Sequence, residues 1–318
     1  MMRPGPVRAD GGAPSTDVAG SWPRKEPDTH AMSVEGPCRR SSRRFRREKR
    51  PNPSPRSSLP TPSLRWCRCS SCPAAGSRGI GLTVRMRVAC FQSGVGGLLP
   101  AGEWSRVLRE CGARGVDLLV TPEFGVGGLP HTAAAAEERA VDDPESLLPL
   151  AEGSAPGMTV VLGFTERTDV GLHSSAAVLR DGGVLTIVRK RHPREPGLVA
   201  GGESSVVEVA AMGVGVLVCA DATRPEPARS LVAGGAGLLA CLLNNDMSEA
   251  NAARWQRPTH EALADRAREN GCWVVSADVA GTSPGRRALA ATRIVRPDGS
   301  LLATVPPQPG RLLVRDLA

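Results

Sequence analysis

Three reactive side chains stand at the ends of three apolar runs in this chain. Glu123 closes the run in LLVTPEF, Lys190 closes the run in LTIVRKRHP, and Cys219 closes the run in VLVCAD. A thiolate attacks electrophilic carbon, but a free cysteine has a pKa of about 8.5 and needs a base. A carboxylate can take that proton, and an ammonium group can stabilise negative charge that develops on a substrate. These residue types therefore indicate nucleophilic catalysis, provided that the fold brings them together.

Taken one at a time, the same residues have ordinary structural explanations. A cysteine at a strand end is commonly a small buried filler. Glu123 can bind a helix N-terminus, and Lys190 can be one cation of the RKRH cluster. Open α/β sheets, however, place their ligands at the carboxyl ends of their strands. If the three strands belong to one sheet, the acid, the ammonium and the thiol can converge on one pocket.

The elements that must position these residues alternate between strand and helix from residue 86 onward. EWSRVLRECGARG (103–115) carries apolar residues at helical spacing, and Asp181-Gly182-Gly183 and Pro297-Asp298-Gly299 predict two hairpin turns. Hairpins mixed with βα units favour an α/β sandwich with a mixed sheet. We expect further helices at 225–237 and 253–270, and further strands at 86–93, 116–123, 158–167, 238–246 and 272–278. Residues 204–220 are expected to form a pair of strands with a turn near Met212 and Gly213.

Charge divides the 318 residues into two parts. Residues 1–85 hold 17 Lys and Arg against 6 Asp and Glu, whereas residues 86–318 hold 23 against 26. The basic character of the whole chain therefore belongs to its first 85 residues, and the remainder is mildly acidic. Nucleic acid is not the partner we expect for residues 86–318. Binding of nucleic acid or acidic partners by the basic segment stays an alternative.

Residues 1–85 form a basic Arg/Pro/Ser-rich extension. The stretch RRSSRRFRREKRPNPSPRSSLPTPS lacks apolar periodicity, so we expect it to be disordered. The competing explanation is a start codon assigned too far upstream of a domain that begins with Met86. CRCSSC contains Cys67, Cys69 and Cys72 but no second ligand pair at finger-like spacing, so we do not favour a metal there. No secretory apolar core follows the N-terminal charges.

Other function classes lack their sequence signals. The chain has no P-loop, no H-E-x-x-H helix and no G-x-S-x-G elbow, so we expect neither a cofactor nor a metal. No apolar run reaches the roughly 18 residues that span a bilayer, so we expect no membrane partner. Nine cysteines without a regular framework indicate a reducing compartment, and hence a cytoplasmic protein.

Several short motifs follow one another in a fixed order: MRVACFQ, DLLVTPEF, GFTER, VRKRH, GVLVCADATRPEPAR, a strand with NND, RARENGCWVVSADVAG and RPDGSLLA. In this order and at these spacings, residues 86–318 resemble the nitrilase, or carbon–nitrogen hydrolase, superfamily. The resemblance implies an αββα sandwich that is usually paired across subunits, hence a homodimer or a higher homo-oligomer. It also implies a Glu–Lys–Cys catalytic set, which maps onto Glu123, Lys190 and Cys219.

The resemblance further implies hydrolysis of a non-peptide carbon–nitrogen bond. The substrate we expect is a small amide that gives a carboxylic acid and ammonia through a thioester on Cys219. Glu123 would be the general base, Lys190 would stabilise the thiolate and the oxyanion, and the backbone N–H after Cys219 would be a second oxyanion donor. A nitrile or an N-carbamoyl substrate uses the same nucleophile and stays open. A non-catalytic family member that acts in binding or assembly is the rival from another class.

A second glutamate commonly follows the lysine in this superfamily, and the loop KRHPREPGLVAGGE offers two acids. Glu195 is our candidate, although its distance of five residues from Lys190 is shorter than the resemblance predicts, and Glu203 is expected to be a loop acid. A Cys–His pair of Cys219 with His192 or His260 has no supporting local signature. The remaining cysteines of this region are expected to lie in the core, at Cys90, Cys111, Cys241 and Cys272.

Overall fold

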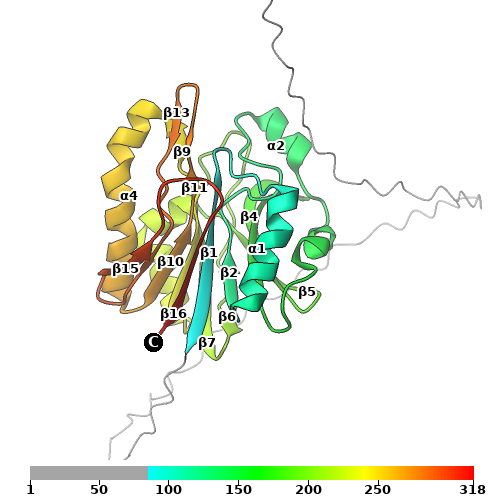
Figure 1. Cartoon of the computed structure of the whole chain (residues 1–318). Helices are drawn as coiled ribbons and strands as arrows, with labels where there is room; N and C mark the ends of the chain where they lie inside the picture. Colours follow the sequence, from blue (N-terminus) through cyan, green and yellow to red (C-terminus); the bar gives the residue numbers. More distant parts are fainter. Residues whose placement is uncertain (1–84) are drawn as a thin grey trace, which may run out of the picture. The chain divides into compact units, whose positions relative to one another are not determined.

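A computed structural model of the chain describes residues 85–318 (Figure 1). The expectations for the basic extension, including the CRCSSC motif, lie outside the described residues and stay predictions. Within the described residues, no helix is long and apolar enough to cross a membrane.

The first sheet is mixed. In it β1, β2 and β3 run parallel to one another, and β4 and β5 follow as antiparallel hairpin partners. The last strand of the chain returns to pair antiparallel with β1 along its whole length. Its seven strands are β1 (Met86–Gly94), β2 (Leu118–Val120), β3 (Thr159–Thr168), β4 (Gly171–Arg180), β5 (Gly183–Arg189), β11 (Val279–Ala280) and β16 (Arg311–Leu317).

The second sheet is also mixed, with a parallel centre of β7, β8 and β10. Its six strands are β6 (Val207–Val209), β7 (Met212–Val218), β8 (Leu238–Leu242), β10 (Trp273–Ala277), β14 (Arg293–Val295) and β15 (Leu301–Thr304). A small third sheet contains β9 (Asp246–Ser248), β12 (Thr282–Ser283) and β13 (Arg286–Ala288).

Alternating side chains of β1 show how the two large sheets are packed. Val88 and Cys90 belong to a core that β7 and β8 share, whereas Ala89 and Phe91 belong to a second core on the opposite face. Because side chains of a strand alternate between faces, both faces of this sheet are buried. The first core is therefore the seam between the two sheets.

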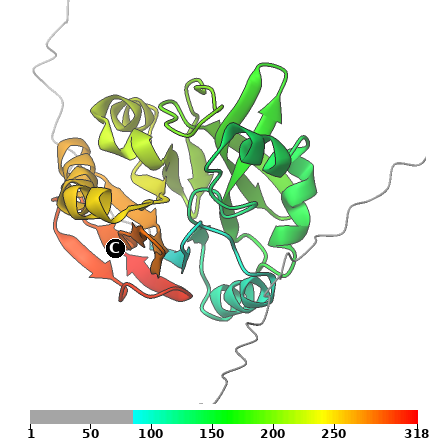
Figure 2. The same cartoon turned by 90° about the horizontal axis from the view of Figure 1, so that it is seen from above.

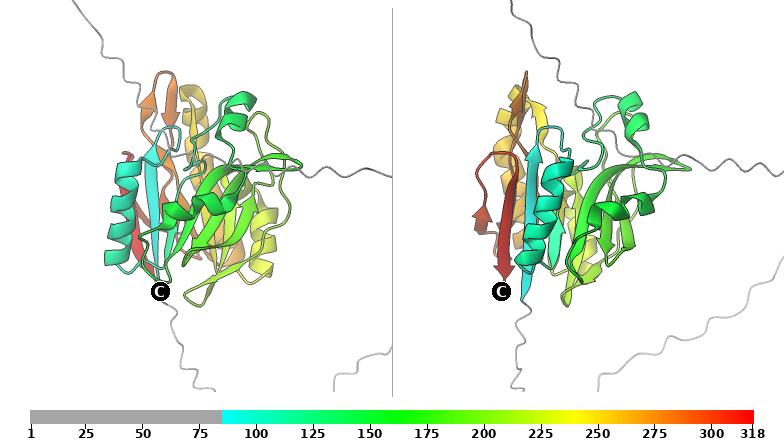
Figure 3. Two further views of the ribbon diagram at one scale, coloured as in Figure 1. Left: turned by 90° about the vertical axis from the view of Figure 1, so that its right-hand side faces the viewer. Right: turned by 45° about the vertical axis from the view of Figure 1, so that its right-hand side comes forward.

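Helices cover the outer face of each sheet. Figure 2 shows α1 and η1 on one side of the strands and α3 and α4 on the other, and both views of Figure 3 show the sheets between them. This arrangement confirms the αββα sandwich. The helices are α1 (Ala101–Ala113), α2 (Ala133–Arg139), η1 (Pro144–Ala151), η2 (Cys219–Thr223), α3 (Pro225–Ala233) and α4 (Glu249–Asn270), with η1 and η2 of the 3₁₀ type.

The helix α4 has clear local reasons for its bounds. The Ser248 side chain accepts a hydrogen bond from the backbone N–H of Asn251 at its start. Gly271 ends it in the left-handed conformation, with φ of 60°, which glycine adopts without steric penalty. Its buried residues Leu263 and Ala267 pack against the second sheet. Its face that carries Asn251 and Trp255 is left to line the site described below.

The structure corrects several expected bounds. The strand expected at 116–123 covers only Leu118–Val120, and α4 begins at Glu249 rather than at residue 253. The turn between β6 and β7 is formed by Ala210 and Ala211, and Cys272 is buried but precedes β10. Most importantly, the three strands that carry Glu123, Lys190 and Cys219 do not share one sheet, because β7 belongs to the sheet opposite β2 and β5.

Candidate active site

Glu123 lies just beyond β2, at the edge where the parallel strands of both sheets end. Its side chain is fully buried, and its Oε1 accepts hydrogen bonds from Ser174 Oγ at 2.6 Å and from Lys190 Nζ at 2.8 Å. Its Oε2 is buried without a hydrogen-bond partner among the described residues. Burial raises the pKa of Glu123, and Lys190 opposes that shift. The carboxylate is therefore a stronger base than an exposed glutamate, with one oxygen free to take a proton.

The backbone around Glu123 is held from both sheets. The Glu123 N–H donates to Leu243 O at 3.1 Å, and Asn244 Nδ2 donates to Glu123 O at 3.1 Å, both after β8 of the second sheet. Phe124 takes φ of 58°, which is uncommon for a residue other than glycine. From the first sheet, Gly163 lies so close that a Cβ there would stand 2.8 Å from Glu123 Cα. The position of the carboxylate is thus fixed by its surroundings.

Lys190 follows β5 and is buried between two carboxylates. Its side chain is 1% exposed, and its Nζ donates to Glu123 Oε1 at 2.8 Å and to Glu195 Oε1 at 2.7 Å. Burial disfavours the ammonium form, but the charge of Glu123, together with those of Glu195 and of Cys219 in its thiolate form, outweighs burial and raises the pKa of Lys190. The group therefore stays an ammonium ion.

Glu195 is the acid that the sequence placed unusually near Lys190. Its Oε1 binds Lys190 Nζ, and its Oε2 accepts the backbone N–H of Arg194 at 3.0 Å. Burial favours the neutral acid, but the Lys190 charge and these hydrogen bonds prevail and lower the pKa of Glu195. Despite the short spacing, Glu195 therefore supplies a second carboxylate that binds Lys190. Glu203, the other acid of this loop, is exposed.

Asp221 fixes the loop that follows Lys190. Its carboxylate accepts the backbone N–H groups of Arg191 at 2.9 Å and His192 at 3.0 Å, and it lies 2.7 Å from His192 Nδ1. His192 is therefore paired with Asp221 and not with Cys219. His260 lies on α4 and does not line the cavity that contains Cys219. The geometry thus contradicts the Cys–His alternative.

Cys219 starts η2 directly after β7 and takes φ of 46°. A left-handed conformation costs a residue with a Cβ roughly 1–3 kcal/mol, and such strain is concentrated at functional sites. Its side chain is partly exposed and lines a cavity. Burial, followed by the charge of Glu123, raises the pKa of the thiol, while Lys190 opposes them. The resting thiol is therefore protonated and needs a neighbouring base to become a nucleophile.

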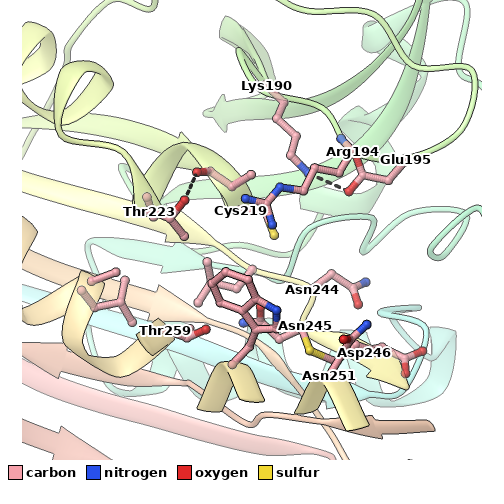
Figure 4. A pocket seen from close by; sticks show the side chains of 17 residues that line it. Lys190, Arg194, Glu195, Cys219, Thr223, Asn244, Asn245, Asp246, Asn251 and Thr259 are labelled. Atoms are coloured by element: carbon pink, nitrogen blue, oxygen red, sulfur yellow. Dashed lines mark hydrogen bonds and ion pairs between the residues drawn. The ribbon is translucent and has the colours of Figure 1, made fainter. Parts of the chain in front are cut away.

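The cavity has a volume of about 290 Å³, near the lower end of the roughly 300–1,000 Å³ of small-molecule sites. In Figure 4, Lys190 and Glu195 lie on one side of it, and Asn244 and Asn251 lie on the other. Glu123 does not line the cavity and has no exposed surface. Besides Lys190, Glu195 and Cys219, the residues that line the cavity include Arg194, Ala220, Thr223, Asn244, Asn245, Asp246, Asn251, Trp255 and Thr259.

The structure brings all four predicted residues together and adds others that sequence reasoning missed. Ser174 and Asp221 carried no distinctive signal, although Asp221 stands two residues after Cys219. Asn244 belongs to the NND that follows an apolar strand, which was the available signal for it. The Gly-rich segment GVGGLP (125–130), whose sequence is typical of a flexible pocket rim, does not line the cavity. Among residues 85–318, no group of three or more His, Cys, Asp or Glu side chains is arranged to hold a metal ion.

Comparisons with known proteins show the family of the chain. Residues 101–318 match the family model described as carbon-nitrogen hydrolase. A protein of Pseudomonas protegens named "Hydrolase in pqqF 5'region" is 31% identical over 245 residues, which are 73% of this chain and 84% of that protein. A nitrilase of Pyrococcus abyssi is 29% identical over 208 residues, which are 62% of this chain and 75% of that protein.

The fold also has solved counterparts. The crystal structure of an amidase from Nesterenkonia sp. superposes with a TM-score of 0.60 at 24% identity, over 73% of this chain and 90% of that chain. The sandwich of two sheets and the matched residues 101–318 together show the family of the chain. It belongs to the carbon–nitrogen hydrolase family, and it is a hydrolase that acts on carbon–nitrogen bonds.

Proposed function

We propose that the chain hydrolyses a small amide to a carboxylic acid and ammonia, with Cys219 as the nucleophile. One observation carries this proposal. The Cys219 thiol and Lys190 line the same cavity, and Lys190 is paired with the buried Glu123, whose Oε2 has no partner among the described residues. A nucleophile, a base and a fixed positive charge are the three parts that acyl transfer needs.

In the first half-reaction, Glu123 Oε2 takes the thiol proton as Cys219 Sγ forms a bond to the amide carbon. The electron pair of the carbonyl moves onto its oxygen, where the Lys190 ammonium and the backbone N–H of Ala220 stabilise the negative charge. The pair then returns, the carbon–nitrogen bond breaks, and the protonated Glu123 gives its proton to the leaving nitrogen. Ammonia leaves, and an acyl thioester remains on Cys219.

In the second half-reaction, water attacks the thioester and gives a proton to Glu123. The carbon–sulfur bond breaks, the carboxylic acid leaves, and the proton returns to Cys219. Glu195 positions Lys190 from the side opposite Glu123, at 2.7 Å. Because Lys190 is held from both sides, it needs little reorganisation when the oxyanion forms.

Two relatives support amides and nitriles as the compounds to test. A variant of the Nesterenkonia amidase carries the acetamide moiety of fluoroacetamide, covalently added at its active-site cysteine. The Pyrococcus abyssi relative is named a nitrilase, so nitriles belong in the same panel, together with N-carbamoyl amino acids. Ammonia release from each compound ranks the three substrate classes.

The test of the function is turnover by Cys219→Ala and Cys219→Ser. Both variants are expected to lose ammonia release from amides while they keep the melting temperature of the wild type within a few degrees. Cys241→Ala is the matched control, because Cys241 is a fully buried cysteine of β8 outside the cavity. Full activity of Cys219→Ala would contradict the mechanism, and a wild type inactive on all three substrate classes would favour the non-catalytic alternative.

The proposal includes a homodimer in the cytoplasm. The five cysteines of the described part are all free, which suits a reducing compartment. Sedimentation velocity measures the oligomeric state, and a monomer at micromolar concentration would contradict it.

A further inference from the structure

Four charged side chains line the cavity, and three of them have ionic partners. Lys190 and Glu195 bind each other, and Asp246 Oδ1 lies 3.1 Å from Arg286 Nε. The fourth is Arg194, whose guanidinium has no ion pair and no hydrogen bond to any of residues 85–318. The cavity therefore contains one positive charge that has no ionic partner among residues 85–318.

Trp255 of α4 holds the Arg194 side chain at the cavity. The guanidinium carbon lies 6.0 Å from the centroid of the Trp255 ring, within reach of a cation–π interaction. An interaction of this kind uses the face of the guanidinium and leaves its N–H groups at the edge free to donate. Figure 4 shows Arg194 directed into the cavity from the side that carries Lys190 and Glu195.

The backbone ties Arg194 to the reaction centre. Arg194 directly precedes Glu195, whose carboxylate binds the Arg194 N–H at 3.0 Å and Lys190 Nζ at 2.7 Å. The backbone of Arg194 is therefore held next to the ammonium that would stabilise the oxyanion, and its side chain reaches the cavity from that point. A substrate bound at both groups would have its reacting carbon and its distal end positioned together.

We propose that Arg194 binds a carboxylate at the distal end of the substrate, so that the amide hydrolysed by this chain is a monoamide of a small dicarboxylic acid. This inference rests on the proposed function. A planar guanidinium with free edge donors matches a carboxylate through two parallel hydrogen bonds. A cationic substrate would be repelled by Arg194, and a neutral one would leave its donors unused. The cavity of about 290 Å³ suits a molecule of this small size.

The test compares matched substrates that differ in the distal group. Succinamate is paired with butyramide and glutaramate with valeramide, so that a carboxylate replaces a methyl group. The wild type is expected to prefer the carboxylated member in kcat/KM. Arg194→Gln is expected to reduce the ratio of carboxylated to neutral kcat/KM by about tenfold or more, mainly through KM.

Arg254→Gln is the control, because the Arg254 guanidinium carbon lies 5.7 Å from the centroid of the same Trp255 ring but Arg254 does not line the cavity. It is expected to leave the ratio unchanged. Equal reductions by both variants, or a wild type that prefers the neutral amides, would overturn the assignment of Arg194.

Binding separates this inference from the proposed function. Calorimetry with Cys219→Ala measures succinamate and butyramide without turnover, and Arg194→Gln in that background is expected to weaken succinamate selectively. If Cys219→Ala still turns over amides, the mechanism fails, while the kcat/KM ratios of the wild type and Arg194→Gln still test Arg194. If amides are hydrolysed but Arg194→Gln weakens succinamate and butyramide equally, only the carboxylate inference fails.

Discussion

Replacement of Gly163 by alanine is expected to impair catalysis from a position that no substrate touches. Gly163 lies in β3, and its φ is not in the left-handed region, so an alanine backbone fits there. The added Cβ, however, would stand 2.5 Å from Pro122 O, 2.8 Å from Glu123 Cα and 2.8 Å from Phe124 N. All three are backbone atoms, so no side-chain rotation relieves the overlap.

The size of the effect follows from these distances. Ordinary van der Waals contact of a Cβ begins at 3.4 Å, so the segment 122–124 or β3 must move by roughly 1 Å. A displacement of about 1 Å at a catalytic group lowers the rate on the order of a hundredfold. Overpacking of this kind lowers the free energy of unfolding by about 1–3 kcal/mol. We therefore expect a stable but slow enzyme.

The assay measures kcat, KM and the urea unfolding midpoint for Gly163→Ala beside Gly202→Ala. Gly202 is the matched control because its Cβ would meet no atom within 4 Å and its φ is not in the left-handed region. Gly163→Ala is expected to lose kcat by about a hundredfold with little change of KM, while Gly202→Ala keeps both. Wild-type kcat in a folded Gly163→Ala protein would refute the view that close backbone packing positions Glu123.

Three further predictions concern the charged groups. Burial raises the pKa of Glu123, so kcat/KM is expected to fall on acidification with a midpoint above the roughly 4.3 of an exposed glutamate, and a midpoint at or below that value would contradict the assignment. Lys190→Met leaves Glu123 and Glu195 buried without their cation and is expected to lower the free energy of unfolding by about 3–5 kcal/mol. That deficit should shrink as the pH falls and the two carboxylates become protonated. Urea unfolding at pH 5 and pH 8 measures the deficit, and a loss of the same size at both pH values would contradict the prediction. Asp221→Ala removes the acceptor of the Arg191 and His192 N–H groups, so it should lower the free energy of unfolding by about 1–3 kcal/mol and reduce kcat. An unchanged urea midpoint would contradict the view that Asp221 holds the loop after Lys190.

The sequence predicted the parts of the site better than their placement. Apolar runs ending at Glu123, Lys190 and Cys219 identified the three strand ends, because buried strands and their polar ends differ sharply in composition. Nothing local shows which sheet a doubly buried strand joins, and the condition that the three strands share one sheet is not met. The ends of the three strands converge because the two sheets face each other with the carboxyl ends of their parallel strands at one edge.

Elements with weak periodicity were missed for a similar reason. The strand β16, with sequence RLLVRDL, is antiparallel to β1, a partner more than 200 residues away, and only that pairing makes it a strand. The helix α2 is four alanines followed by charged residues and has no apolar stripe to reveal it. Ser174 looked like an ordinary strand residue, and its role depends on Glu123 reaching it from 51 positions away.

The most direct test of the account is the mass of the peptide that contains Cys219 after an acid quench during turnover of a small amide. The account predicts that wild-type protein, and with slower turnover Glu123→Gln, carries the acyl group as a thioester on Cys219 alone. An unmodified Cys219 during undiminished turnover, or an acyl group on another cysteine of residues 86–318, would contradict it.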